Sequence, residues 1–546
     1  MPFWKEHSKV LILFLVLCSG ILITSPFANF QGYLSQGDHG RDLYAAQAVY
    51  RGELPYKDFW WNYGPLMPYY YGLFFKVLGV QIGSILLGQS FLRILAGILM
   101  CLGMMEVASP LAAFLCACWF MLFQQNFFFT YNHIGGLCMG IGTVFCLLAY
   151  IQRRSLKAAW GALGFIFILC LIKINFGIAD LAVCVITIGV CDLVSREQPK
   201  PGKISFYAAA LGGLPLLLLA IYYSLLRGLS LTEMRQCLPY FDPLMESGRA
   251  SAPTPLMAIG IFLQMTWHTL SLNWTNITVA LIINASALRC LYLLAKNKLP
   301  AARKTVLILS LGMLGLFYVA NFHEYLKSGL WYRAFWAQPY SIMIAFLLID
   351  TATKTIPKLI RAIIFLFLAV MIIICCLFIL RQVDSLKTRS QYLPLPRAYI
   401  YMSNSPSWIS TVEQTTEYLK ATLKDNELFF ALPYDCLYYY LTDRKAPTRQ
   451  LIFFENIKIS PQQERSVIAE LEKKHVNYIL LSNRAFAHIE PGLGVLGTDY
   501  CPLIEKYIEK NFMPVTRFGD WIDEPGWAWN HGTFILKRKT PLAAGR

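Results

Sequence analysis

Long apolar runs alternate with short polar ones over the first 381 residues of this chain, and the pattern ends after Leu380. A helix of about 20 apolar residues is long enough to cross a bilayer core of roughly 30 Å. Eleven such runs predict transmembrane helices at 9–26, 83–106, 109–129, 134–151, 158–176, 177–195, 204–227, 274–295, 304–322, 332–350 and 359–381.

Two further apolar pieces, 66–80 and 255–270, are shorter and rich in aromatic residues. Tyr and Trp gather at the membrane–water interface, and short amphipathic helices can lie in that plane. We expect both pieces to lie at the interface, and whether either one crosses the membrane is left open.

The composition agrees with a polytopic membrane protein, since 56% of the 546 residues are hydrophobic, 15% are charged and the mean hydropathy is +0.48. The formal net charge is +16, but the residues from Gln382 onward carry about 20 basic and 18 acidic side chains. The excess therefore lies between the apolar runs, which argues against nucleic acid as a partner. The 15 cysteines stand mostly inside apolar runs and are expected to be small core residues.

Lysine and arginine mark the cytoplasmic loops of membrane proteins. With eleven spans and the N-terminus inside, five of the six cytoplasmic segments are basic clusters. The first loop, 28–82, and the chain after residue 381 then share the extracytoplasmic side. For a chain of this bacterial character we expect the inner membrane and its periplasmic or outer face. The first span lacks a small-residue cleavage site and is expected to be an uncleaved signal anchor.

Residues 382–546 mix charges, prolines and short amphipathic stretches, as a water-soluble domain does. Capping boxes begin at Ser410, before a helix that ends near Lys424, and at Ser460. Strands are expected at 427–432, 478–482 and 533–537, and their alternation with helices predicts a Rossmann-like α/β layer. We therefore divide the chain into a helical transmembrane domain, 1–381, and an extracytoplasmic α/β domain, 382–546.

The first loop concentrates charge between two apolar runs, in the stretch GDHGRDLYAAQAVYRGELPYKDFWWNYGPL at 37–66. Asp42 to Val49 is predicted as a short helix that ends near Gly52 and Pro55. Asp38 lies just ahead of it, where a helix N-terminus favours a carboxylate or a bound phosphate.

This stretch resembles the first extracytoplasmic loop of the GT-C glycosyltransferases. That family uses dolichyl- or polyprenyl-phosphate sugars and includes protein O-mannosyltransferases and the lipid A aminoarabinose transferase. The resemblance is specific over about 30–95 and architectural over the remaining spans. The matching positions are Asp38, Ala45, Ala46, Gly52, Pro55, Tyr56, Asp58, Asn62, Gly64, Pro65, Leu66, Leu78, Gly79 and, in the next span, Arg93.

The resemblance implies a GT-C fold and a membrane enzyme that transfers a sugar from a polyprenyl-phosphate donor to a lipid, glycan or protein acceptor. Two positions depart from the family pattern. His39 replaces the usual acidic neighbour of the Asp, and Asn132 with His133 stands where several members carry a second Asp. No cofactor is certain, and these departures put in doubt the divalent metal that relatives suggest.

Glycosyl transfer from a lipid phosphate needs a base for the acceptor and positive charge for the departing phosphate. We assign the base to Asp38, with a helix cap or a salt bridge to Arg41 as the alternative. Candidate phosphate ligands are Arg41, Lys173 and Arg333, although a cation at the end of a span is often only an interface anchor. Supporting roles are left open for His39, Asp42, Asp58, Asn62, Arg93, Asn132 and His133.

Two other kinds of function remain as alternatives. A transporter or lipid flippase would show internal repeats and interrupted spans, and no convincing repeat is present. A non-catalytic envelope assembly protein that keeps the scaffold would explain the missing second acidic position.

Overall fold

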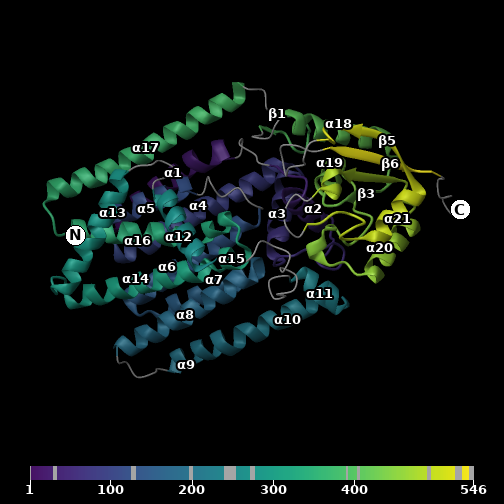
Figure 1. Cartoon of the computed structure of the whole chain (residues 1–546). Helices are drawn as coiled ribbons and strands as arrows, with labels where there is room; N and C mark the ends of the chain where they lie inside the picture. The colour runs from purple at the N-terminus through teal and green to yellow at the C-terminus, as the bar shows by residue number, and fades with distance from the viewer. Residues whose placement is uncertain are drawn as a thin grey trace.

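The computed structural model describes residues 2–28, 34–123, 131–195, 201–238, 254–270, 277–388, 392–401, 406–487, 493–522 and 532–539. It consists of a helical half and a half that contains a four-stranded sheet, side by side along the long axis of the molecule (Figure 1). We call these two parts the helical half and the sheet half.

The helical half is built from long helices joined by shorter ones. The long helices are α1 (Pro2–Ala28), α4 (Ile82–Val107), α5 (Pro110–Phe123), α6 (His133–Arg153), α7 (Leu156–Ile172), α8 (Ile174–Ser195), α12 (Pro255–Leu270), α13 (Ile277–Ala295), α14 (Ala301–Asn321), α16 (Gln338–Thr353) and α17 (Lys358–Thr388). The shorter ones are α2 (Asp38–Tyr50), α3 (Leu66–Leu78), α9 (Pro201–Ala208), the π-helical turn η2 (Ala209–Gly213), α10 (Leu214–Leu226), α11 (Leu231–Cys237), α15 (His323–Ser328) and the 3₁₀ helix η4 (Trp331–Trp336).

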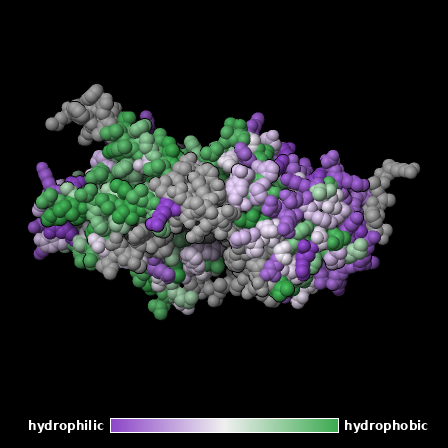
Figure 2. All heavy atoms as spheres, turned by 90° about the horizontal axis from the view of Figure 1, so that it is seen from above, coloured by the Kyte–Doolittle hydropathy of each residue, from purple (hydrophilic) through white to green (hydrophobic). Residues whose placement is uncertain are grey.

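Among the described residues, seven helices are long and apolar enough to cross a membrane, and they match seven of the predicted spans. The predicted spans at 9–26, 109–129 and 158–176 overlap shorter apolar helices, as does the piece 255–270. Residues 124–129 of the second span lie outside the described residues. The predicted span 332–350 begins in η4 and continues as α16. On the face shown in Figure 2, hydrophobic residues cover much of the helical half, whereas hydrophilic residues are more frequent on the sheet half. The chain is an integral membrane protein, and the count of eleven spans stays a prediction.

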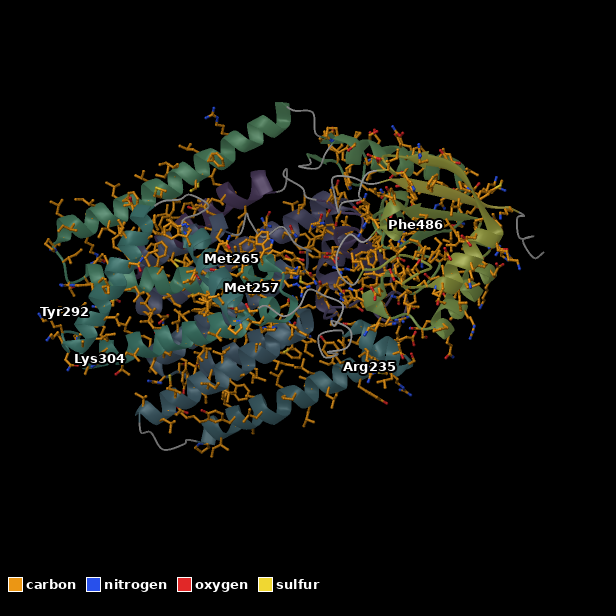
Figure 3. The ribbon with its side chains drawn as sticks, viewed as in Figure 1. Arg235, Met257, Met265, Tyr292, Lys304 and Phe486 are labelled. Carbon is orange, nitrogen blue, oxygen red and sulfur yellow. The ribbon has the colours of Figure 1, made fainter. Side chains whose placement is uncertain are left out.

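Polar contacts gather at the end of the helical half that lies away from the sheet. Ser109, before α5, donates from its backbone N–H to Asp350 Oδ2 at 3.1 Å and from its hydroxyl to Asp350 Oδ1 at 2.5 Å. Figure 3 places Tyr292 and Lys304 at this same end, whereas Arg235 lies near the sheet half. Lys304, in one of the connections that the sequence marks as basic, thus lies at the end away from the sheet.

The sheet has the strand order β3-β4-β6-β5 and is mixed. Its strands are β3 (Phe429–Leu432), β4 (Tyr478–Ser482), β5 (Phe512–Phe518) and β6 (Thr533–Arg538). β3 and β4 are parallel, with Leu432 opposite Leu481, whereas β4–β6 and β6–β5 are antiparallel. A Rossmann layer is mostly parallel, so that part of the prediction is wrong. The three expected strands are present, and β5 was missed because most of its side chains are partly or fully exposed.

The other elements of the sheet half surround this sheet. They are the short strands β1 (Tyr392–Leu393) and β2 (Ile400–Tyr401), the helices α18 (Pro406–Thr422), α19 (Leu437–Thr442), α20 (Pro461–Lys473) and α21 (Pro502–Asn511), and the 3₁₀ turns η5 (Glu455–Ile457) and η6 (Asn483–Phe486).

Two helices begin earlier than the sequence predicted. α2 begins at Asp38, because the Arg41 backbone N–H already donates to the Gly37 carbonyl at 2.7 Å. α18 begins at Pro406, so Ser410 lies inside the helix and its hydroxyl accepts a bond from Gln414. The capping box of α20 at Ser460 is confirmed.

The sheet half rests on the first loop through backbone contacts. The Leu437 N–H donates to the Gln36 carbonyl at 3.0 Å, and the Trp60 N–H donates to the Arg449 carbonyl at 2.8 Å. At Gly40 an added Cβ would lie 2.3 Å from the Leu437 nitrogen. Only glycine permits this approach, so α2 is fixed against α19.

Candidate active site

Asp38 is the first residue of α2, and its side chain is 48% exposed. The Tyr434 hydroxyl, from the sheet half, donates to Asp38 Oδ1 at 2.9 Å. Arg41 Nη1 lies 3.4 Å from the same oxygen. One carboxylate oxygen is thus held while the side chain as a whole stays half open to solvent.

Arg41 is buried one turn further along α2. Its Nε and Nη2 donate to Asp42 Oδ1 at 2.9 and 2.7 Å, and its Nη1 donates to Asn62 Oδ1 at 3.2 Å. The guanidinium also lies 5.3 Å from the Trp61 ring and 4.9 Å from the Tyr63 ring. These contacts fix its orientation, since a planar guanidinium has its donors in a rigid fork.

Asp42 is buried beside Arg41. Burial raises the pKa of Asp42 from 3.8 to about 6, against the lowering effect of the Arg41 cation. Two carboxylates, Asp38 and Asp42, therefore share one guanidinium, and this group carries a formal charge of −1 when both are ionised.

A second charged group lies at the C-terminal end of α7, beside α15 and η4. Lys173 Nζ lies 2.8 Å from Glu324 Oε1, and Arg333 Nη1 lies 3.4 Å from Glu324 Oε2. Asn175 Nδ2 also donates to Glu324 Oε1, at 2.8 Å. Lys173 Nζ is 4.6 Å from the centre of the Trp336 ring. The group carries a formal charge of +1, and the Lys173 side chain is 2% exposed, so Lys173 is not a simple interface anchor.

The first loop fixes the end of α7. The Gly64 N–H donates to the Ile172 carbonyl at 2.9 Å. A Cβ on Gly64 would lie 2.1 Å from the Leu171 carbonyl oxygen. The backbone at Lys173 is extended there, with φ −149° and ψ 90°, before α8 begins. Because α7 ends at this point, the Lys173 side chain lies near the first loop, with Nζ 5.9 Å from the Tyr63 ring.

Tyr63 joins the two charged groups. Its ring lies 4.9 Å from the Arg41 guanidinium and 5.9 Å from Lys173 Nζ. His133, the first residue of α6, packs between Tyr63, at 5.8 Å, and Trp336, at 5.1 Å. The structure thus brings together seven residues that the sequence marked, namely Asp38, Arg41, Asp42, Asn62, His133, Lys173 and Arg333.

Other marked residues have contacts of their own elsewhere. His39 is buried, and its Nδ1 accepts the Ser35 N–H at 3.2 Å. The Asp58 carboxylate accepts the Leu54 N–H at 2.7 Å within its own turn. Arg93 is buried in α4 with Tyr71 as an electrostatic neighbour, and Asn132 is buried in front of α6.

Sequence reasoning missed Glu324 and Tyr434. Glu324 stands next to His323 in the stretch that supplied Arg333, and an acidic residue at the end of a span could have been recognised as a partner for Lys173. Tyr434 carries no local signal, because it lies 396 residues from Asp38 in the chain.

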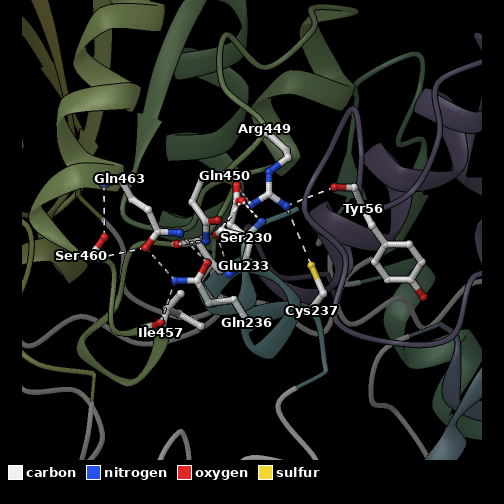
Figure 4. A network of polar contacts seen from close by, with 11 residues as sticks. Tyr56, Ser230, Glu233, Gln236, Cys237, Arg449, Gln450, Ile457, Ser460 and Gln463 are labelled. Atoms are coloured by element: carbon white, nitrogen blue, oxygen red, sulfur yellow. Dashed lines mark hydrogen bonds and ion pairs between the residues drawn. The ribbon is translucent and has the colours of Figure 1, made fainter. Parts of the chain in front are cut away.

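α11 links the first loop to the sheet half on another side of the site (Figure 4). Arg449 Nη2 donates to Glu233 Oε1 at 2.8 Å, and Arg449 Nη1 donates to the Tyr56 carbonyl at 3.1 Å. The amides of Gln236 and Gln463 exchange hydrogen bonds at 2.9 and 3.1 Å. A polar cavity of about 500 Å³ opens beside this network, lined among others by Glu53, Lys57, Asp58, Glu233, Lys445 and Arg449.

A metal site with several protein ligands does not fit this arrangement. No group of three or more His, Cys, Asp or Glu side chains within the described ranges could hold a metal ion. The Arg41 guanidinium contacts both Asp38 and Asp42, where a shared cation would otherwise bind.

No family model matches the sequence, and no curated protein matches it. Several solved structures resemble the chain in fold, including the following two. ArnT from Cupriavidus metallidurans in the apo state has a TM-score of 0.56 at 11% identity, covering 97% of this chain and 98% of that one. The apo oligosaccharyltransferase of Archaeoglobus fulgidus has a TM-score of 0.51 at 11% identity, covering 89% and 70%. The fold is that of the GT-C glycosyltransferases, as the first loop predicted.

Proposed function

We propose that this protein is a membrane glycosyltransferase that takes a sugar from a polyprenyl-phosphate carrier and transfers it to an extracytoplasmic acceptor. The observation that carries the proposal is the separation of charge across Tyr63. Asp38, Asp42 and Arg41 form the negative side, and Lys173, Arg333 and Glu324 form the positive side. Such a transfer needs a negative group to accept the proton of the acceptor and a positive group to stabilise the released phosphate.

On the negative side, Asp38 accepts the proton of the acceptor hydroxyl or amine as that atom attacks the anomeric carbon of the sugar. On the positive side, the bond from that carbon to the phosphate oxygen breaks, and the electron pair leaves with the phosphate. Lys173 and Arg333 stabilise the departing charge, because fixed cations in a buried site are more effective than water. Attack opposite to the leaving group inverts the anomeric centre.

The fold and two ligands of related structures support the choice of donor. The same ArnT has been solved with undecaprenyl phosphate, and the oligosaccharyltransferase with a dolichol-phosphate. In this chain the lipid tail would lie among the apolar helices and the sugar phosphate at their end beneath the first loop. We further propose that this end faces the periplasm or the cell exterior of a bacterial inner membrane. The acceptor class, whether lipid, glycan or protein, is left to experiment.

The test supplies purified protein with a set of polyprenyl-phosphate sugars and measures sugar transfer and donor hydrolysis. We expect turnover with one donor, and a loss of about 10²- to 10⁴-fold in Asp38→Asn, the range of a general base. Asp58→Asn is the matched control, since Asp58 is exposed and bonds to its own turn. Equal turnover by Asp38→Asn and wild type would remove Asp38 as the base. No turnover with any donor would favour the assembly-protein alternative.

A further inference from the structure

Tyr434 lies at the edge of the sheet where the two parallel strands end. β3 ends at Leu432, and Tyr434 follows two residues later. β4 ends at Ser482, and Arg484 likewise follows two residues later. In α/β sheets, functional groups gather outside the carboxyl ends of parallel strands. Here that edge faces the first loop, since the Tyr434 hydroxyl reaches Asp38 Oδ1 at 2.9 Å.

The Tyr434 side chain is held in one place. It is 1% exposed and packs edge-on against Phe454, with ring centres 6.1 Å apart. The Arg484 guanidinium lies 5.6 Å from the Phe454 ring and donates to the Tyr434 carbonyl at 3.5 Å. Asp435, the next residue, accepts the Ser482 hydroxyl at 2.9 Å. Contacts from both strand ends thus fix the phenol before any ligand arrives.

Tyr434 is the donor in its bond to Asp38. Burial raises the pKa of Tyr434 well above its ordinary value, and the Asp38 carboxylate raises it further, against the lowering effect of Arg41. The phenol therefore stays protonated at neutral pH. A neutral donor beside a carboxylate stabilises the charged form of that carboxylate.

We propose that Tyr434 is a positioning residue for Asp38, and that the sheet half therefore completes the active site. This inference rests on the proposed function. The described contacts to the Asp38 carboxylate, from Tyr434 and Arg41, both fall on Oδ1. Oδ2 is then the oxygen presented to the acceptor. The acceptor proton moves to Oδ2, while Tyr434 keeps its own proton and holds the carboxylate in line.

The experiment compares Tyr434→Phe with Tyr440→Phe. Tyr440 is a matched control, because it is also buried in the sheet half and its hydroxyl donates to the Arg397 carbonyl at 3.0 Å, away from Asp38. We expect Tyr434→Phe to lower kcat about ten- to hundred-fold, the value of a hydrogen bond to a charged group. KM for the donor should stay unchanged, and Tyr440→Phe should keep the wild-type kcat.

The split between kcat and KM separates positioning from a general structural role. A positioning role predicts a lower kcat with an unchanged KM for the donor, because only the alignment of Asp38 in the transition state is lost. A general structural role would change both constants together. An unchanged kcat in Tyr434→Phe, with Asp38→Asn inactive, would overturn the inference.

A stability measurement tests the interaction between Asp38 and Tyr434 without an activity assay. The unfolding midpoints of wild type, Asp38→Asn, Tyr434→Phe and the double variant form a double-mutant cycle. We expect the two changes to be coupled, whereas Asp38→Asn and Tyr440→Phe should be additive. Absence of sugar transfer by the wild type would refute the proposed function. Additive effects of Asp38→Asn and Tyr434→Phe on the unfolding midpoint would refute the contact between these two residues, whether or not the wild type is active.

Discussion

Asp350 and Asp38 are carboxylates at opposite ends of the helical half, and their surroundings differ. Asp350 is 0% exposed, and both of its oxygens are occupied by Ser109, Lys354 and Arg361. Asp38 is 48% exposed in its side chain, and its described contacts fall on one oxygen. A carboxylate whose hydrogen-bonding capacity is filled stabilises a fold. One that is held on one side and open on the other is suited to accept a proton.

The cations at the two ends differ in their exposure to solvent. At the end away from the sheet, Lys203 pairs with Asp192 at 2.7 Å, and Lys354 and Arg361, which contact Asp350, have side chains that are 25% and 32% exposed. Lys173 and Arg333, which contact Glu324, are only 2% and 19% exposed. Taking charged groups out of water is costly, so burial of the cations, rather than their number, distinguishes the end near the sheet.

Among the changes that test this comparison, the largest expected effect follows from replacing Lys173. Lys173→Met should lower kcat/KM for the polyprenyl-phosphate donor about 10²- to 10³-fold, because the departing phosphate loses a fixed positive group. Lys203→Met is the matched control and should leave kcat/KM unchanged. Steady-state kinetics with varied donor measure both. A similar loss in the two variants would mean that the comparison between the ends is wrong.

A smaller effect, on stability, is expected at the other end. Asp350→Asn should lower the free energy of unfolding by about 1–3 kcal/mol, because Lys354 and Arg361 lose their shared carboxylate. These side chains are 25% and 32% exposed, so water compensates part of the loss. Thermal unfolding in detergent measures the change, and turnover per folded molecule should match the wild type. A loss of turnover at full stability would contradict the structural role of Asp350.

The smallest expected effect concerns pH and Asp42. Burial raises the pKa of Asp42 to about 6, so below that pH the folded protein holds a proton and Arg41 loses a charged partner. We expect kcat/KM to fall about two- to ten-fold as the pH drops from about 7.5 to about 5. Asp42→Asn should lack this inflection in the pH–rate profile. An inflection near pH 6 in that variant would assign it to another group.

The ionisation of Asp42 should affect the free energy of unfolding in the direction opposite to its effect on kcat/KM. Between pH 3.8 and about 6 the folded protein binds a proton at Asp42 that the unfolded chain has released. The ionised carboxylate therefore destabilises the fold above about pH 6, and this cost disappears as the pH falls toward 3.8. Relative to Asp42→Asn, the wild type should gain stability on acidification over this window.

Seven of the spans predicted from the sequence agree with the structure, and several residues marked for the site lie close together, while their roles stay predictions. Apolar run length located the helices, because a bilayer imposes one length on every span. The charged first loop marked Asp38, Arg41 and Asn62, which the structure places in contact around one guanidinium. Lys173 and Arg333 were marked as cations near span ends, and they meet at Glu324.

Other parts depended on contacts that no local pattern encodes. β5 escaped because an edge strand with many exposed side chains lacks a hydrophobic face. The start of α2 was misplaced because its first turn is fixed by backbone bonds and by the approach of Leu437 to Gly40. Tyr434 reaches Asp38 only after both halves have folded, and a single sequence does not show which distant residues meet.

The bond between Tyr434 and Asp38 also bears on how the protein is made. At about 5–20 residues per second on the ribosome, the 396 residues between them take about 20 to 80 s to synthesise. Asp38 is therefore synthesised well before the phenol that contacts it, and this contact forms only once the sheet half has been made.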